Sequence, residues 1–235
     1  MVGVSLASYM RECQLDRVRA TLRSGASVTD AVFDAGYRSA SAFYERGALR
    51  LGMTPVRYRD GALGERIRYT TIATPVGLVL AASTDQGVCS IRIGASEKAL
   101  REALVTEFPH ATIERDDHGL GDVALVLAGA VRGEVDAGDL PLDLRGTAFQ
   151  IRVWEALRSI SVGETRTYSD VAAQIGSPRA VRAVASACAA NAVALAIPCH
   201  RVVRRDGSLG GYRWGLAVKE ALLLAEQTRD VTQLP

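Results

Sequence analysis

The hydrophobic residues of this 235-residue chain change their spacing twice, and these changes limit the folds that the chain can adopt. Residues 1–60 carry apolar side chains at helical intervals. Three short runs of strand-like composition follow, at residues 67–72, 78–82 and 88–93. From Phe149 onward the helical spacing returns. The pattern predicts an α+β fold in which a small strand-containing part lies between two helical parts.

Three domains are expected from these changes. A polar, glycine-rich stretch at residues 60–65 marks the first boundary, so residues 1–60 form one unit. We expect a strand-and-helix subdomain at residues 65–145 and a helical domain at residues 146–230. The first ends in a possible edge strand at residues 141–144. The helices expected in these two domains cover residues 97–108, 122–131, 168–175, 178–189 and 216–227.

Composition favours a soluble cytoplasmic protein. No run of about 18 apolar residues is present, so no transmembrane helix is expected. The first residues lack a basic segment followed by an apolar one, which argues against a signal peptide. The four cysteines, Cys13, Cys89, Cys188 and Cys199, form no CxxC pair. This spacing predicts neither a disulfide framework nor a metal site.

The charge of the chain is unevenly distributed. Residues 1–64 hold nine arginines and six acidic residues, a net charge of +3, and residues 141–235 have a net charge of +4. Residues 65–140 between them have a net charge of −5. Either end is therefore a candidate for contact with a phosphate backbone, and the middle is not. The alternative is that such small net charges arise by chance.

The N-terminal helices have the form of a helix-turn-helix. Ser27 or Thr29 is expected to cap a short helix through Phe33, and Gly36 ends it. Residues 31–59 resemble the second helix-turn-helix of the AraC family. The shared features are Ala35, Gly36-Tyr37, Ser39, Ser41, Phe43-Tyr44, Gly52, Thr54-Pro55 and Arg59. That family carries two such units, so the resemblance implies a partial AraC-type unit.

The segment Ile197–Val202 reads Ile-Pro-Cys-His-Arg-Val. It matches the signature of the O6-alkylguanine-DNA alkyltransferases, and the resemblance extends from about Tyr69 to Gln227 through RGTAFQIRVWEAL, SPRAVRAVASACAAN and GGYRWGLAVKEALLL. The resemblance implies an RNase H-like fold for residues 65–145 and a winged-helix-type fold for residues 146–230. It also implies direct-reversal DNA repair, in which an alkyl group moves irreversibly from guanine O6 to a cysteine.

Cys199 is the candidate acceptor. Displacement at an alkyl carbon needs a soft nucleophile, and a thiolate is the best among side chains. A thiol with a pKa of about 8.5 is only slightly ionised at neutral pH, so a base is needed. His200 is adjacent, but neighbours in an extended segment point opposite ways. The resemblance implies that His200 reaches the thiol through a water and that Glu220 orients His200. Without the resemblance, Glu220 reads as a solvated helix residue.

Other residues take their expected roles from the same resemblance. Tyr168 is implied to donate a proton to guanine N3, and the alternative is a core tyrosine. Asn191 is implied to tie the cysteine loop by hydrogen bonds, and its alternative is a helix C-cap. Tyr212 is implied to form a wall of the alkyl pocket. Three further residues are expected to shape the pocket, namely Pro198, Val202 and Gly211.

Residues 179–189 predict a helix with one surface of small side chains. Such a surface allows close approach to a narrow groove, and tight helix packing is the alternative. The resemblance implies that this helix enters the DNA minor groove and that Arg182 occupies the space of the flipped base. Ala183, Ser186 and Ala187 are expected beside Arg182 in this interface. Cys188 is expected to be packing or pocket wall.

The sequence therefore predicts a single-turnover methyltransferase that acts on alkylated guanine in double-stranded DNA. No cofactor, metal, membrane or obligate protein partner is expected, and a monomer suffices. We expect a bacterial cytoplasmic protein that is nucleoid-associated when it acts. The alternatives are a transcription regulator of the alkylation response through residues 1–60, and a thiol hydrolase with a Cys–His pair. The sequence leaves open the range of alkyl groups and any activity on O4-alkylthymine.

Overall fold

The computed structural model describes residues 14, 17, 18, 20–22, 26–37, 39, 43, 64–144 and 146–232. Within them, helices and a mixed sheet form an α+β fold with three clusters of buried apolar side chains. The smallest cluster lies in the N-terminal segment, and the largest joins the sheet to the C-terminal helices. No helix in the described part of the chain is long and apolar enough to cross a membrane.

Helix α2 spans Val28–Asp34 and agrees with the helix predicted after Ser27. The Ser27 hydroxyl accepts a hydrogen bond from the Asp30 amide at 3.1 Å, so it satisfies an amide at the helix start. Buried side chains of α2 pack against Phe43. Of the other residues that resemble the AraC family, Ser41, Tyr44 and Gly52 to Arg59 lie outside the described residues.

The sheet has four strands in the order β3-β2-β1-β4. Strands β1 (Arg66–Thr74), β2 (Gly77–Thr84) and β3 (Gly87–Gly94) form an antiparallel meander at the three predicted positions. Strand β4 (Thr112–Arg115) pairs in parallel with β1 and was not predicted. The sequence Thr-Ile-Glu-Arg lacks the apolar alternation of a strand because β4 is a short, partly exposed edge.

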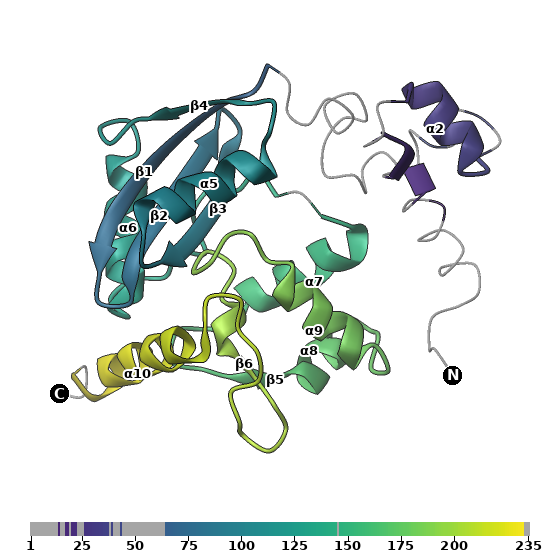
Figure 1. The fold of residues 1–235 in the computed structure, drawn as a ribbon. Coiled ribbons are helices and arrows are strands. Elements are labelled where there is room, and N and C mark those ends of the chain that lie inside the picture. The colour runs from purple at the N-terminus through teal and green to yellow at the C-terminus, as the bar shows by residue number, and fades with distance from the viewer. Residues whose placement is uncertain are drawn as a thin grey trace.

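Two helices cover opposite faces of this sheet (Figure 1). Side chains alternate along β2, so Leu80 and Ala82 pack with α5 (Glu97–Glu107), whereas Val79 and Ala81 pack in the cluster that contains α6 (Gly121–Val131). Both helices occupy their predicted positions. The edge strand predicted at residues 141–144 is reduced to one bridge between Val88 and Leu142, beside which Pro141 has no amide hydrogen to donate.

Three helices build the first part of the C-terminal region, α7 (Ala148–Arg158), α8 (Tyr168–Gln174) and α9 (Val181–Ala189). Capping boxes at Thr147 and Thr167 fix the starts of α7 and α8. Helix α9 begins three residues later than the predicted start at Pro178. Two short strands, β5 (Arg166–Thr167) and β6 (Val202–Val203), pair in parallel and complete the winged-helix-type arrangement.

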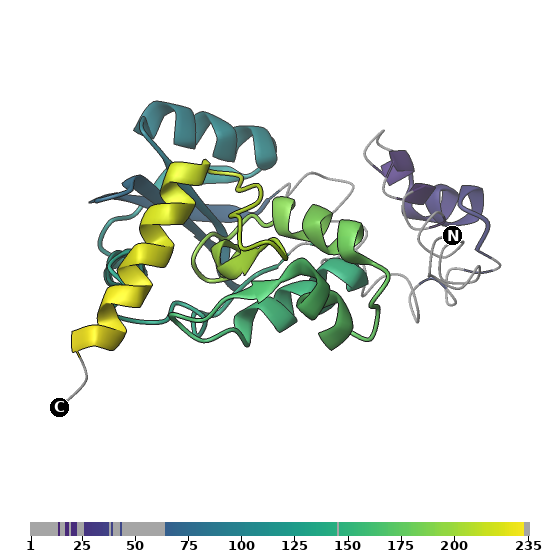
Figure 2. The same ribbon diagram turned by 90° about the horizontal axis from the view of Figure 1, so that it is seen from below.

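Helix α10 spans Leu216–Thr232 and extends beyond the predicted end at residue 227. In both ribbon views it lies beside the strand-and-helix part of the molecule (Figures 1 and 2). Gly133 makes this close approach possible. Its φ is +72°, and a Cβ there would lie 2.4 Å from the carbonyl oxygen of Ala225 in α10.

A Gly133→Ala substitution should destabilise the fold by about 2–3 kcal/mol, because it adds backbone strain and a backbone clash at one position. Urea or thermal unfolding followed by circular dichroism measures this loss. Gly121→Ala is the matched control, since a Cβ there would meet no heavy atom within 4 Å. Equal stability of the two variants would show that α10 is not held against this turn.

Candidate active site

Cys199 opens a single turn of 3-10 helix, Cys199–Arg201, directly after Pro198. The expectation of an extended segment here was wrong, because the Arg201 amide donates to the Pro198 carbonyl at 3.0 Å and closes the turn. The turn lies in the interior, since Cys199, His200 and Arg201 are all buried and Cys199 is only 5% exposed; the Val202 that follows is fully buried. The fold therefore shields the Cys199 thiol from bulk solvent.

The side chain of Asn191 holds this turn in place. Its Nδ2 donates to the Ile197 carbonyl oxygen at 2.9 Å and to Cys199 Sγ at 3.2 Å, and its Oδ1 accepts from the Val193 amide at 2.9 Å. Asn191 follows α9 and is fully buried. One amide side chain thus ties the end of α9 to the cysteine turn.

The carboxylate beside His200 is Glu226, not Glu220. His200 Nε2 lies 2.8 Å from Oε1 of Glu226, and both side chains are almost completely buried. Both glutamates lie on α10, but Glu220 is on its exposed side, so the prediction that Glu220 orients His200 was wrong. The buried face of α10 carries Lys219, Leu222 and Glu226, spaced by three and four residues, and position 220 is rotated away from it.

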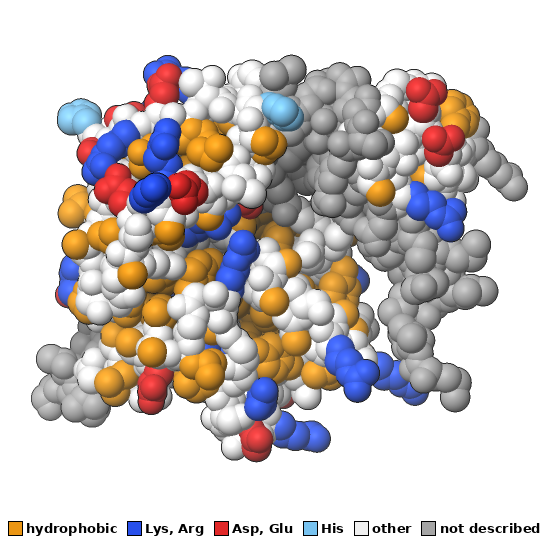
Figure 3. Space-filling view, viewed as in Figure 1, with side chains coloured by type: hydrophobic (Ala, Val, Ile, Leu, Met, Phe, Trp, Pro, Cys, Tyr) orange, Lys and Arg blue, Asp and Glu red, His pale blue; other side chains and the backbone are white. Residues whose placement is uncertain are grey.

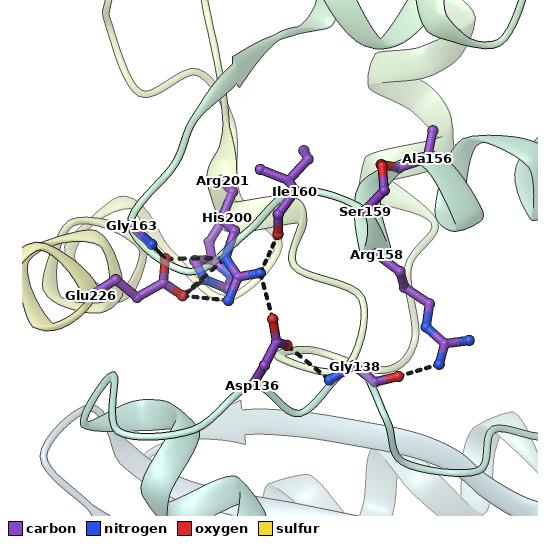
Figure 4. Close-up of polar contacts among 10 residues, drawn as sticks. All are labelled: Asp136, Gly138, Ala156, Arg158, Ser159, Ile160, Gly163, His200, Arg201 and Glu226. Atoms are coloured by element: carbon purple, nitrogen blue, oxygen red, sulfur yellow. Dashed lines mark hydrogen bonds and ion pairs between the residues drawn. The ribbon is translucent and has the colours of Figure 1, made fainter. Parts of the chain in front are cut away.

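Arg201 is the second partner of Glu226. Its guanidinium contacts both carboxylate oxygens, at 2.9 to 3.1 Å, and its Nη1 donates to the Ile160 carbonyl oxygen at 2.6 Å. Asp136 lies 3.4 Å from the same Nη1. Figure 4 shows Arg201 between Glu226 and Asp136, with His200 on the Glu226 side. The buried carboxylate is therefore fully paired.

These contacts set the protonation states of Glu226 and His200. Burial alone would raise the pKa of Glu226, but the hydrogen bonds and charges of His200 and Arg201 outweigh it and lower the pKa to about 2. Burial lowers the pKa of His200 below its usual 6.5. A neutral imidazole beside a carboxylate must carry its proton on Nε2, because an ionised carboxylate only accepts. Nδ1 is then the free base of His200.

The Cys199 thiol is protonated at rest. Burial raises its pKa above the usual 9.0, and this effect outweighs the Asn191 hydrogen bond and the positive charges of Lys219 and Arg213, which lower it. His200 Nδ1 has no hydrogen-bond partner among the described residues. A direct thiol–imidazole hydrogen bond is thus absent there, and removal of the thiol proton needs a bridging group.

Two tyrosines and a glycine loop lie next to the turn. Tyr168 is the first residue of α8, and burial raises the pKa of its phenol. The loop approaches this phenol closely, since a Cβ on Gly210 would lie 3.1 Å from Tyr168 Oη. Gly211 beside it is exposed, and Tyr212 packs edge-on against Trp214 at 5.1 Å between ring centroids. The loop that bears Tyr212 thus lies next to the α8 phenol.

The outer face of α9 presents Arg182, Ala183 and Ser186 to solvent. Ala187 is only 2% exposed, which corrects its inclusion in this face. It shares the buried side of the helix with Val184, and its carbonyl oxygen accepts a hydrogen bond from Trp154 Nε1 at 2.9 Å. Figure 3 shows basic side chains over the α8–α9 region, whereas basic and acidic side chains lie side by side on the loop after β6 and over the sheet.

The sequence of this chain is similar to those of known methyltransferases. The methylated-DNA–protein-cysteine methyltransferase of Mycolicibacterium paratuberculosis is 38% identical over 168 residues, which cover 72% of this chain and 97% of that protein. This chain belongs to the methylated-DNA–protein-cysteine methyltransferase family. Residues 148–228 match the family described as "6-O-methylguanine DNA methyltransferase, DNA binding domain", and residues 1–61 match "Helix-turn-helix domain".

Longer relatives combine both parts. The "Bifunctional transcriptional activator/DNA repair enzyme Ada" of Escherichia coli K12 is 40% identical over 97% of this chain, which spans 64% of that protein's length. The crystal structure of Mycobacterium tuberculosis OGT in complex with DNA matches with a TM-score of 0.58 and 37% identity. The match covers 70% of this chain and 94% of the Mycobacterium tuberculosis chain. The methyltransferase fold thus accounts for the part after the helix-turn-helix.

Sequence reasoning missed three charged residues around Cys199. Glu226 and Arg201 form the buried pair, and the ammonium of Lys219 donates to the carbonyl oxygens of Val202 and Leu209. Lys219 is fully buried. For Lys219 and Glu226, the signal in the sequence is that both lie on one face of the last helix, seven residues apart with the apolar Leu222 between them, which a reading of single motifs overlooks.

Glu226→Gln should slow alkyl transfer to Cys199 by about 10- to 100-fold, because an amide can also donate and no longer fixes the proton of His200 on Nε2. Single-turnover kinetics with an excess of protein over methylated DNA measure the rate. Glu220→Gln, on the exposed side of α10, should stay within about twofold of the parent.

The melting temperature of each variant is measured as well, because Glu226→Gln also removes the partner of Arg201. The transfer rates are then compared at a temperature well below the lower of the two melting temperatures. A large rate loss in Glu220→Gln with a normal rate in Glu226→Gln would overturn the assignment of the carboxylate.

Proposed function

We propose that this chain repairs DNA by irreversible transfer of an alkyl group from guanine O6 to Cys199. The observation that carries the proposal is the buried thiol beside a neutral imidazole whose free nitrogen is fixed by Glu226. The family of the chain, and the DNA complex of its Mycobacterium tuberculosis relative, support DNA as the partner. We also propose the domain division at residues 1–60, 65–145 and 146–230.

The proposed reaction is an SN2 displacement. A bond forms between Cys199 Sγ and the alkyl carbon while the bond from that carbon to guanine O6 breaks. The thiol proton passes through a water to His200 Nδ1, and the electron pair of the broken bond goes to the purine. Tyr168 donates a proton toward guanine N3, so the purine leaves without full negative charge.

The product explains why each molecule acts once. Sulfur bonded to an alkyl carbon is a thioether, which no group of this site cleaves. Repair is therefore stoichiometric, and the balance of atoms requires neither a cofactor nor a metal ion. The alkyl group of the lesion and the free thiol are used up together. Burial raises the pKa of the Cys199 thiol, so the thiol is protonated in the free protein.

We propose that the outer face of α9 enters the minor groove. The groove is about 6 Å wide, so small side chains such as Ala183 and Ser186 allow the helix to approach the base edges. Arg182 then occupies the space of the guanine that turns out of the stack, where its planar guanidinium stacks and remains charged. A monomer is sufficient for this interface, and binding takes place on the nucleoid.

A second role in transcription is supported by the helix-turn-helix match over residues 1–61. The Escherichia coli relative joins both activities in its name. In this reading, residues 1–60 bind promoter DNA of the alkylation response. A gel-shift survey tests it, because a promoter binder forms a sequence-specific complex that persists in salt, whereas a repair domain alone binds DNA with little sequence preference.

Intact-protein mass spectrometry after mixing with a duplex that holds one O6-methylguanine should show one added methyl group. The methyl should map to Cys199 and should be absent in Cys199→Ala. Cys188→Ala is the control, since Cys188 is buried in packing and should leave transfer intact. No added mass together with tight lesion binding would instead indicate a lesion sensor.

Arg182→Ala should slow repair of duplex DNA by about tenfold or more, because unstacking a base step costs a few kcal/mol that the inserted side chain offsets. Reaction with free O6-methylguanine should change much less. Arg179→Ala removes a neighbouring exposed charge and should weaken DNA binding without this selective loss. Repair of duplex by Arg182→Ala at the parent rate would overturn the insertion role.

A further inference from the structure

Two buried polar atoms near Cys199 have no hydrogen-bond partner among the described residues. They are Nδ1 of His200 and the hydroxyl oxygen of Tyr212, and no other buried side-chain nitrogen or oxygen in that part of the chain shares this property. A buried polar group without a partner destabilises a fold, so proteins supply one from the chain or from ordered water. Because His200 Nδ1 and the Tyr212 hydroxyl lie at the same site, a single group can form hydrogen bonds with both.

The two side chains lie next to each other and next to the thiol. The rings of His200 and Tyr212 are 6.4 Å apart between centroids and nearly perpendicular, at 79°. The pKa of Tyr212 is raised well above 10, first by burial and then by the nearby charges of Cys199 and Glu226. The phenol is therefore protonated throughout the working pH range and remains able to donate a hydrogen bond.

We propose that the Tyr212 hydroxyl positions the water that carries the proton from Cys199 to His200. This inference rests on the proposed function. The water accepts hydrogen bonds from the thiol and from the phenol, and it donates one to Nδ1. Three bonds are typical of a buried water. During transfer the thiol proton moves to the water and a water proton moves to Nδ1, while the phenol keeps its own proton.

This role differs from that of a pocket wall. As a wall, Tyr212 uses its ring, which packs against Trp214. As a positioning residue it uses its hydroxyl, which the ring packing does not need. Tyr212→Phe separates the two roles because it keeps the ring and removes one oxygen atom.

The test is the rate of methyl transfer to Cys199 in single-turnover experiments between pH 6 and pH 10, for the parent and for Tyr212→Phe. At pH 7 the variant should react about tenfold more slowly, because the relay is a proton transfer that depends on a positioned water. The deficit should shrink as the pH approaches the raised pKa of the thiol, since a thiolate needs no relay.

The charged and titratable side chains that act on the thiol from neighbouring elements are unchanged in the variant. They are Lys219 of α10 and Arg213 of the loop before it, together with Cys188 of α9 and Tyr168 of α8. Tyr69→Phe is the matched control, because it removes the hydroxyl of a buried tyrosine in β1, and it should follow the parent at every pH.

A Tyr212→Phe rate equal to the parent rate at every pH would overturn the inference. A deficit that stays constant with pH would also overturn it and would leave Tyr212 a wall only. Reaction of Cys199 with iodoacetamide, mapped by mass spectrometry, gives a second readout without DNA and should show the same pH-dependent deficit. Failure of the proposed function would appear differently, as a parent protein that takes up no methyl group from DNA.

Discussion

The geometry of the site depends on one buried carboxylate. Glu226 accepts hydrogen bonds from His200 and from the Arg201 guanidinium, and its Oε2 lies 3.3 Å from the Gly163 amide nitrogen, which also donates to it. Charge is costly to bury unless it is paired, and removal of one partner of such a pair typically costs about 3–5 kcal/mol. The ion pair therefore keeps Glu226 ionised, and the ionised carboxylate in turn fixes the free nitrogen of His200.

The same pair connects distant parts of the chain. Arg201 contacts the Ile160 carbonyl and Asp136, and Arg158 donates to the Gly138 carbonyl in the same segment (Figure 4). The strand-and-helix part thus contacts the turn that bears Cys199, although it supplies no group to the proposed reaction. Its contribution is to support α10 and the turn, because a positioning error of a fraction of an ångström weakens a proton relay.

Burial gives the thiol a second property that suits the proposed reaction, in which the protein acts once. A thiol whose pKa is raised is a poor nucleophile toward solutes that do not fit the site. Asn191, Lys219 and Arg213 favour the thiolate and limit this rise. For the proposed reaction, the site thus combines protection of the sulfur by burial with three groups that favour its ionisation.

Much of the fold followed from local patterns. Three strands, the ends of α5 and α6, and a cap at Ser27 or Thr29 were predicted because apolar spacing and capping residues act over a few positions, and the structure selects Ser27. Strand β4 was missed because a short edge strand with two charged residues has no such pattern. The prediction of Cys199 as the acceptor rests on the six-residue motif, whose residues are contiguous in the sequence.

The sequence by itself determined the α+β fold class and the family, and it predicts Cys199 as the acceptor. It predicts Glu220 as the carboxylate that contacts His200, whereas in the packed structure this carboxylate is Glu226. Both glutamates lie on a helix that was correctly predicted, but only the direction in which α10 packs against the turn selects the buried face. That direction depends on Gly133, Arg201 and Asp136, which are distant in sequence, so no local pattern contains it.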